Sequence, residues 1–339
     1  MYHVRFRGTH YEIGHRFGSS LAKHGKHLLT NVPFPITQKH IDFSHACFPV
    51  YQEFFPEIIE EIKGLAEGQH CEADMLQAVL FSMYALPPAC NCSCFAVSDG
   101  EHILLGRNSD FLTELEKLNT NTIYHFSNNS YNFTGNTTAF VEMEDGINEH
   151  GLAVGLTSVY PITIKPGFNA GMLLRFFLEK CKTTEEVIRD IRRLPIASAQ
   201  TITVADITGN IAVIERNSEK INVIHPSEKQ PFVCATNIFS SPEMSAQQNP
   251  DIDNWQSELR YNTLLQTLGK YGGKMDLQDA QSLLAGKTGF LCQYDRTTGK
   301  DTVWSVIYDI KKKAIYRAEG NPGRKKFIKD ERFFDMQAP

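Results

Sequence analysis

Residues 90–110 decide how this chain is interpreted, and they read CNCSCFAVSDGEHILLGRNSD. Two strand-like runs in this stretch flank Asp99-Gly100, a dipeptide typical of the two-residue type I′ turn of a β-hairpin. A hairpin with that turn places Cys92 directly opposite Arg107, and cross-strand neighbours lie about 5 Å apart. A nearby cation favours the thiolate, which is the nucleophilic form of cysteine. The stretch therefore predicts a hairpin that carries a reactive thiol at Cys92.

The same register discriminates between the three neighbouring cysteines. It places Cys90 and Cys94 opposite uncharged residues, so only Cys92 faces a cation. Asp110, just beyond the second strand-like run, is a candidate for orienting the same group. A zinc site built from the three cysteines would need a fourth ligand and usually a two-residue spacing. A loop longer than two residues would shift this register, so the pairing is a hypothesis.

Composition excludes some classes of function. The chain has 339 residues, a length that suits one large domain or two smaller ones, and a formal net charge of -5 without the basic stripe that nucleic-acid binding requires. The N-terminus carries no apolar run suited to a signal peptide, and no stretch is apolar for long enough to span a membrane. Eight cysteines scattered over a long chain favour reduced thiols. We expect a soluble cytoplasmic protein.

The pattern of apolar residues changes at Cys92. The preceding residues are interpreted as helical, with a clear amphipathic helix from Phe54 to Gly68. After Cys92, short strand-like runs alternate with helices, and a capping box at Thr183–Glu186 and an N-cap at Asp276 mark two of the helix starts. Strands interleaved with helices predict an α+β fold with layered sheets and helices outside.

The hairpin resembles the nucleophile hairpin of the choloylglycine hydrolase and penicillin V acylase family. It resembles at least as much the related acyl-CoA:6-aminopenicillanic acid acyltransferase group, which carries a helical prosegment before its cysteine. Further similar motifs follow in the family's order along nearly the whole chain: Gly8–Gly14, Glu61–Gly68, Asp145–Leu152, Ala235–Asn237, Ser257–Tyr261 and Gly320–Pro322. Ser93 stands where the family often has threonine, and Asn91 stands where the family pattern does not dictate a residue.

This resemblance implies a four-layer αββα sandwich of the N-terminal-nucleophile hydrolase type. It divides the chain into a helical prosegment, residues 1–91, and a catalytic domain, residues 92–339. It also implies that the Asn91-Cys92 peptide bond is cut by the chain itself, which makes Cys92 a new N-terminus with a free α-amine. Such an amine, with a reference pKa near 8, serves as the base while the thiol of the same residue serves as the nucleophile.

The resemblance assigns roles to five side chains besides the nucleophile. Asn237 donates its side-chain amide to the oxyanion of the tetrahedral intermediate. Arg107 and Asp110 hold the thiol and the amine, and Arg260 braces the site electrostatically. Tyr160 falls near the place of another oxyanion-hole contributor. The implied reaction is hydrolysis or acyl transfer at a linear, non-peptide amide through an acyl-thioester.

Two rival interpretations remain open. A papain-like thiol peptidase would need a separate histidine, and the nearest one, His102, lies toward the turn of the predicted hairpin. A chain that never cleaves would be a binding module of the same fold. His24 and His27 share a helix face, but no carboxylate or cysteine pattern accompanies them as in a metal site.

The sequence also gives expectations for cofactors and partners. We expect no cofactor and no metal ion. The expected partner is a small-molecule amide substrate, with an acyl-CoA or an amine acceptor if the enzyme transfers acyl groups. Neither nucleic acid nor a membrane is expected as a partner, and homo-oligomerisation is left open.

Overall fold

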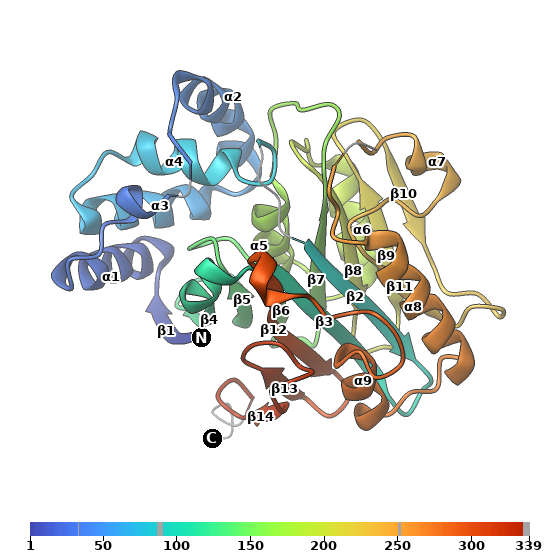
Figure 1. The fold of residues 1–339 in the computed structure, drawn as a ribbon. Coiled ribbons are helices and arrows are strands. Elements are labelled where there is room, and N and C mark those ends of the chain that lie inside the picture. Colours follow the sequence, from blue (N-terminus) through green and yellow to red (C-terminus); the bar gives the residue numbers. More distant parts are fainter. Residues whose placement is uncertain (33, 87–90, 250–251, 335–339) are drawn as a thin grey trace.

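The computed structural model describes residues 1–32, 34–86, 91–249 and 252–334 (Figure 1). Within these residues, two β-sheets pack face to face. One has eight strands: β1 (Tyr2–Gly8), β4 (Thr120–Phe126), β5 (Phe133–Thr137), β6 (Asp145–Asn148), β7 (Ala153–Val159), β8 (Ala199–Ala205), β9 (Ile211–Arg216) and β10 (Ile221–Ile224), in that spatial order. The other has six: β11 (Phe232–Ala235), β2 (Asn91–Ser98), β3 (Ile103–Leu112), β12 (Lys300–Asp309), β13 (Ala314–Ala318) and β14 (Ile328–Asp330).

Helices cover the outer faces of both sheets. The eight-stranded sheet is covered by α5 (Ala170–Lys180) and α6 (Thr184–Arg193), and the six-stranded sheet by α8 (Ser257–Tyr271) and α9 (Leu277–Leu284). Separate apolar clusters fill the space between the sheets and the space under each helical layer. The fold is therefore α+β with four layers in the order αββα, as predicted. The remaining short segments are α7 (Pro242–Ser245) and 3-10 turns at Leu28–Asn31, Thr113–Leu118 and Arg296–Thr298.

Four further helices lie together beside the sheets (Figure 1). They are α1 (His10–Lys23), α2 (Gln38–Phe54), α3 (Pro56–Gln69) and α4 (Ala73–Ser82). The prediction that everything before Cys92 is helical is wrong at the start of the chain, because Tyr2–Gly8 forms β1, which pairs in parallel with β4 at the edge of the eight-stranded sheet. The alternation of apolar and polar residues along β1 is weak, since Phe6 is the only buried large apolar side chain of this strand.

Glycines allow α1 and α3 to touch backbone to backbone. A Cβ atom on Gly14 would lie 2.0 Å from the carbonyl oxygen of Glu61, and one on Gly64 would lie 2.2 Å from that of Tyr11. Gly18 and Gly68 make similarly close approaches one turn further along. Any side chain at these positions would force the helices apart. The two glycine-containing motifs of the N-terminal region are thus complementary surfaces of one helix pair.

The β2–β3 hairpin has a different register from the predicted one. Cys92 pairs with Ser109, and Cys94 is the residue opposite Arg107. A four-residue loop causes the shift: the Asp99 carboxylate accepts hydrogen bonds from the backbone N–H groups of residues 101 and 102, at 2.9 and 2.7 Å. A type I′ turn needs a positive φ at both central residues, and only Gly100 has one, at 88°. Because the shift is two residues, the same side chains still face the same sheet.

Candidate active site

Cys92 lies inside the molecule, on a strand flanked by partners on both sides. β2 runs between β11 and β3, and its side chains alternate, so that Cys94 and Ala96 fill the space between the sheets while Phe95 points to the helices. Cys92 is on the same face as Cys94 and is completely buried. The thiol therefore lies between the two sheets, where side chains from both can reach it.

Arg107 makes the decisive contact with the thiol despite the shifted register. Its Nη2 donates to Cys92 Sγ at 2.7 Å, diagonally along the shared face of the hairpin. The rest of the guanidinium binds the other sheet, because Nη1 donates to Asp145 at 2.9 Å and Nε to the carbonyl of Leu156 at 2.9 Å. A longer contact from Nη2 reaches Glu144 at 3.3 Å. Arg107 is thus fixed from three directions with one donor aimed at the thiol.

The neighbouring residues keep this arrangement in place. Asp145 accepts three further hydrogen bonds, from Trp304 Nε1 at 2.9 Å, from the Tyr308 hydroxyl at 2.6 Å and from Asn136 Nδ2 at 2.5 Å. Gly155 on β7 leaves the space that the site needs, since a Cβ there would lie 2.6 Å from the sulfur of Cys94 and 3.4 Å from Cδ of Arg107. The site thus depends on two residues of the opposite sheet, the carboxylate of Asp145 and the glycine at position 155.

Asn237 reaches Cys92 because of the β11–β2 register. Ala235 pairs with Cys94, so the chain arrives beside Cys92 two residues later. The backbone N–H of Cys92 donates to Asn237 Oδ1 at 2.8 Å, and Asn237 Nδ2 donates to the carbonyl of Ser158 at 2.8 Å. The hydroxyl of Ser257 accepts from the Asn237 backbone N–H at 2.8 Å. The amide side chain is therefore oriented with its oxygen on the nitrogen that a cut would convert into an amine.

Arg260, in the first turn of α8, is completely buried and binds the other main-chain group of Cys92. Its Nη1 donates to the Cys92 carbonyl oxygen at 2.5 Å and to the Ser93 hydroxyl at 3.0 Å, while Nη2 donates to Asn237 Oδ1 at 3.0 Å. Arg260 and Asn237 together thus hold both polar groups of the Cys92 backbone.

Asp110 lies opposite Asn91 in the hairpin and close to the same guanidinium, with 3.7 Å between its Oδ2 and Nη1 of Arg260. The hydroxyls of Tyr294 and Thr302 donate to its two oxygens at 2.9 and 2.6 Å. Burial raises the pKa of Asp110 to about 6, although Arg260 and the two hydroxyls act in the opposite direction. The group therefore titrates just below neutral pH.

Two further predicted residues lie as follows. Tyr160 is the first residue after β7, half-buried, two positions beyond the carbonyl of Ser158 that binds Asn237. Its role in an oxyanion hole stays a prediction. His102 lies in the hairpin loop, seven register positions from Cys92, which corresponds to roughly 23 Å along a strand. This separation argues against a Cys92–His102 pair of the papain kind. Cys90 lies outside the described residues.

Sequence reasoning brought together Cys92, Arg107, Asp110, Asn237 and Arg260, and the structure places all five in one cluster of contacts. It missed their supporting residues: Glu144, Asp145, Ser257, Tyr294 and Thr302. A signal for two of these existed in Glu142-Met143-Glu144-Asp145, three acids within four residues of an otherwise apolar, strand-rich region. Burying ionised carboxylates requires a cation, and Arg107 supplies it for Glu144 and Asp145.

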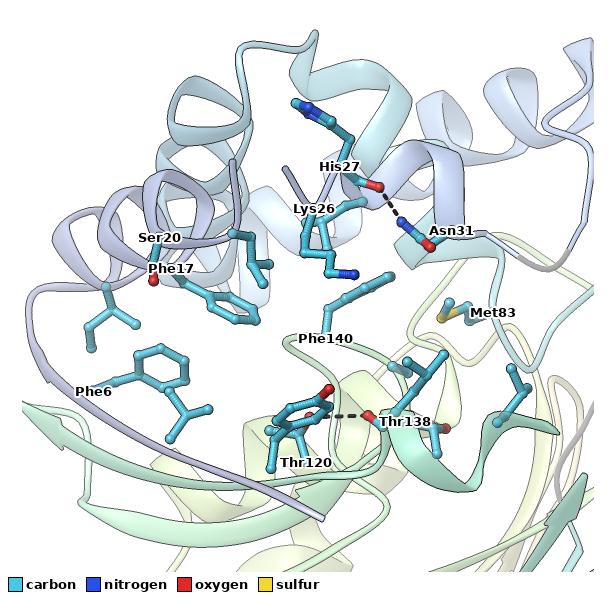
Figure 2. Close-up of a pocket in the computed structure, with 18 of the residues that line it drawn as sticks. Phe6, Phe17, Ser20, Lys26, His27, Asn31, Met83, Thr120, Thr138 and Phe140 are labelled. Carbon is cyan, nitrogen blue, oxygen red and sulfur yellow. Dashed lines mark hydrogen bonds between the residues drawn. The ribbon is translucent and has the colours of Figure 1, made fainter. Parts of the chain in front are cut away.

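A large cavity adjoins the site without containing Cys92 (Figure 2). Its volume is about 790 Å³, within the range of small-molecule sites. Phe111, next to Asp110, lines it, as does Thr138. The backbone N–H and the hydroxyl of Thr138 donate to Glu144, the residue in contact with Arg107. A chain of contacts through Thr138, Glu144 and Arg107 therefore connects the cavity wall to the thiol.

Neither a membrane helix nor a metal cluster is found in the part of the chain that the structure describes. No helix there is both long and apolar enough to cross a bilayer. No group of three or more His, Cys, Asp or Glu side chains there is arranged to hold a metal ion. The seven cysteines of that part are free thiols.

Solved structures that resemble this chain include a hydrolase, an amidase and an acylase. A mutant of conjugated bile acid hydrolase from Clostridium perfringens matches with a TM-score of 0.52 and 16% identity, covering 73% of this chain and 93% of that one. An N-acylethanolamine-hydrolyzing acid amidase orthologue from Caenorhabditis elegans matches with a TM-score of 0.49 and 21% identity, covering 65% and 93%. Penicillin V acylase from Agrobacterium tumefaciens matches with a TM-score of 0.45 and 16% identity, covering 67% and 82%.

Comparison with family models identifies the family of this chain. A search of curated proteins gives no match. Residues 97–324, more than half of the chain, match the family of acyl-coenzyme A:6-aminopenicillanic acid acyl-transferases, and this range contains Arg107, Asp110, Asn237 and Arg260 although it begins after Cys92. The fold, the arrangement of the site and this match agree with one another, and the chain belongs to the acyl-coenzyme A:6-aminopenicillanic acid acyl-transferase family.

Proposed function

We propose that this protein is a self-processing cysteine enzyme that hydrolyses or transfers acyl groups at linear, non-peptide amides. The observation that carries the proposal is the convergence on one residue: Arg107 contacts the sulfur of Cys92, Asn237 its backbone nitrogen and Arg260 its carbonyl oxygen. A structural thiol in a strand needs none of these three contacts. Family membership supports the same class of reaction.

Maturation would begin with attack of Cys92 Sγ on the carbonyl carbon of Asn91. The C–N bond breaks, the thiol proton passes to the departing nitrogen, and a thioester links Asn91 to the sulfur. Water then hydrolyses the thioester and leaves a carboxylate on Asn91, a free thiol and a free α-amine on Cys92. Asn237 Oδ1 already accepts from the nitrogen that becomes this amine. In this proposal residues 1–91 are the prosegment and residues 92–339 the catalytic chain.

Catalysis would use both groups of the new N-terminus. The α-amine, with a reference pKa near 8, accepts the thiol proton as Sγ attacks the substrate carbonyl. The amide Nδ2 of Asn237, which now donates to the carbonyl of Ser158, would turn to the oxyanion, and removal of such a donor typically costs about 3 kcal/mol. Tyr160 would supply a further contact. The amine product leaves with a proton, and water or a second amine resolves the acyl-thioester.

The arginines and Asp110 would tune the electrostatics of these steps. The guanidinium of Arg107 stabilises negative charge on the sulfur. Its two carboxylate partners offset the free energy that burying the cation costs. Arg260 holds the backbone of the nucleophile. Asp110, ionised above a pKa of about 6, balances the charge of Arg260 and faces Asn91 across the hairpin.

Intact-mass spectrometry of the purified protein tests the proposal. We expect the wild-type chain to give two fragments separated at Asn91-Cys92 and the Cys92→Ala variant to give one uncut chain. Cys94→Ala is the matched control, because Cys94 is equally buried on the same face of the same strand and should be dispensable. A wild-type chain that stays whole, or a Cys94→Ala chain that stays whole while wild type is cut, would contradict the assignment.

A second measurement, on the processed enzyme, tests whether water or an amine accepts the acyl group. With an N-acyl amide as substrate, hydroxylamine competes with water for the acyl-thioester. A hydroxamate as main product at millimolar hydroxylamine indicates an acyltransferase, and free carboxylic acid indicates a hydrolase. Failure of both products in a fully processed protein would contradict the amide-cleaving activity while leaving self-processing intact.

A further inference from the structure

The cavity beside the site has an apolar body. It lies between the N-terminal helices and the edge of the eight-stranded sheet, and Phe6, Phe17, Met83 and Phe140 project into it from different elements (Figure 2). Most of its wall is apolar, including Val4, Ile13, Leu21, Leu28, Phe34, Leu86, Phe111, Leu115 and Leu118. A space of about 790 Å³ with such a lining suits a long hydrocarbon chain.

The charges that line this cavity all have one sign. Four cationic residues contribute to it, and no aspartate or glutamate does, although the chain as a whole has a net charge of -5. Arg16 is engaged, since it donates to the carbonyl of Arg7 at 3.0 Å. Lys26 has no carboxylate partner within the described residues. Figure 2 shows its ammonium group reaching into the cavity toward Phe140.

Hydrogen bonds to the backbone of Lys26 fix the turn that carries this residue. Helix α1 ends in a Schellman motif: Gly25 takes a left-handed φ of 68°, its N–H donates to the carbonyl of Ala22, and the Lys26 N–H donates to that of Leu21, both at 2.9 Å. The buried side chain of Gln69 then donates to the Lys26 carbonyl at 3.2 Å. The turn reverses the chain over the cavity and is tied to α3. Lys26 is therefore an exposed cation whose backbone is anchored at the mouth of an apolar cavity.

We propose that this cavity binds an amphiphile with a straight apolar chain and a terminal carboxylate, the chain lying against Phe6 and Phe17 and the carboxylate pairing with Lys26. A neutral lipid would gain nothing from the exposed ammonium group, and a cationic one would be repelled by Lys26 and Arg16. The carboxylate has two chemical sources: a free fatty acid, or the acid group of an N-acyl amino acid. Binding of this kind does not depend on Cys92 being catalytic.

Isothermal titration with the full chain carrying Cys92→Ala, which cannot turn a ligand over, tests the proposal. Dodecanoate is the probe, and dodecanol is its neutral counterpart. We expect dodecanoate to bind at least tenfold more tightly than dodecanol, and Lys26→Gln to remove this preference while leaving dodecanol binding unchanged. Lys23→Gln is the matched control, because Lys23 is an exposed cation in the last turn of the same helix and does not line the cavity.

Three outcomes decide the result. A preference for dodecanoate that disappears only in Lys26→Gln supports the proposal, and N-dodecanoylglycine binding more tightly than dodecanoate would identify the N-acyl amino acid as the source. Equal binding of dodecanoate and dodecanol to the chain with Lys26 overturns the role of the cation. No binding of either compound, or binding unaffected by Phe17→Ser, overturns the cavity as the site.

Discussion

Arg107 and Arg175 are both completely buried in this molecule, and they are used differently. Arg175 on α5 contacts Glu61 and Glu179 at 2.5 Å each and lies over the ring of Tyr124 at 4.1 Å. The two carboxylates balance the positive charge of Arg175. Arg107 also has two carboxylate partners, Asp145 at 2.9 Å and Glu144 at 3.3 Å, but the thiol of Cys92 at 2.7 Å lies closer than either.

This difference separates a structural cation from one whose closest partner is the thiol that we propose as the nucleophile. Around Arg175 the compensation is strong enough that, although burial raises it, the pKa of Glu179 falls to about 2 under the influence of Arg175 and His10. Since His10 and Glu61 belong to α1 and α3, this cluster fastens the N-terminal helices to the sheet domain. Arg107 makes its shortest contact with the thiol instead of a carboxylate.

The largest expected effect is on stability, from Arg175→Met. The change would leave Glu61 and Glu179 buried without their cation, and breaking a buried pair in this way typically costs about 3–5 kcal/mol. Urea denaturation measures the loss. Arg189→Met is the control, since Arg189 is exposed and its pairing with Asp190 should contribute little to the free energy of unfolding. Equal losses in both variants would show that the buried Arg175 cluster contributes no more to stability than an exposed ion pair.

The second prediction concerns Arg107→Lys, which keeps the charge but removes the planar fork. One ammonium group cannot contact Leu156, Asp145 and Cys92 in the way the guanidinium does. We expect self-cleavage to slow by about 100-fold, equivalent to about 2.7 kcal/mol, with the far-ultraviolet circular dichroism unchanged. The rate of fragment appearance by mass spectrometry checks this. Cleavage at the wild-type rate would show that charge alone suffices.

The third prediction uses the titration of Asp110. Its folded pKa of about 6 lies above the reference value near 4, so the folded state binds this proton more tightly than the unfolded state. The free energy of unfolding should therefore fall as the pH rises from about 4 to about 6, by an amount on the order of 2–3 kcal/mol. Above pH 6 this carboxyl group should cause no further decrease. Asp110→Asn should lack this dependence.

Denaturation at pH 4.5 and pH 7.5 provides the comparison, with the difference between wild type and Asp110→Asn as the measured quantity. The wild-type cleavage rate should rise through pH 6 if the carboxylate form is the active one, and the variant should cleave slowly at every pH. A variant that cleaves normally would assign Asp110 to structure alone, together with its partners Tyr294 and Thr302.

The smallest expected effect is at Glu215, which supports the loop after Asn237, the residue that we propose for the oxyanion hole. Its carboxylate accepts from the backbone N–H groups and hydroxyls of Ser240 and Ser241, in the loop that follows Asn237. Glu215→Gln weakens these bonds by about 1 kcal/mol, so we expect a roughly fivefold lower kcat with an unchanged KM. An unchanged kcat with a lower melting temperature would limit Glu215 to a structural role.

Much of the fold followed from local signals in the sequence. The N-caps at Thr183 and Asp276 form as predicted, with backbone N–H groups donating to their side chains. The capping box predicted at Thr183 is only half present, because the carboxylate of Glu186 accepts from the backbone N–H of Lys182 and not from that of Thr183. The helix predicted from Phe54 to Gly68 begins at Pro56 and ends at Gln69. These signals are reliable because capping and amphipathic spacing act within a few residues.

What the sequence could not give depends on contacts between distant segments. The hairpin register depended on whether the Asp99 carboxylate would cap the loop, which the dipeptide alone does not reveal. Strand β1 depends on β4, over a hundred residues later, for its pairing. Arg107 was predicted as a partner of Cys92 from an incorrect register, and the contact survives because side chains two apart on a strand share a face.

The parallel pairing of β1 with β4 has a consequence for the processed protein. If the chain is cut before Cys92, one sheet is shared by two polypeptides, and loss of the shorter one would bare a seven-residue edge of unpaired backbone. Folding of the uncut chain is a unimolecular event, whereas the cut protein reassembles only when two molecules meet. Its midpoint of unfolding would then rise with protein concentration, and a cleavage that activates the enzyme would also make its unfolding hard to reverse at the dilution of a cell.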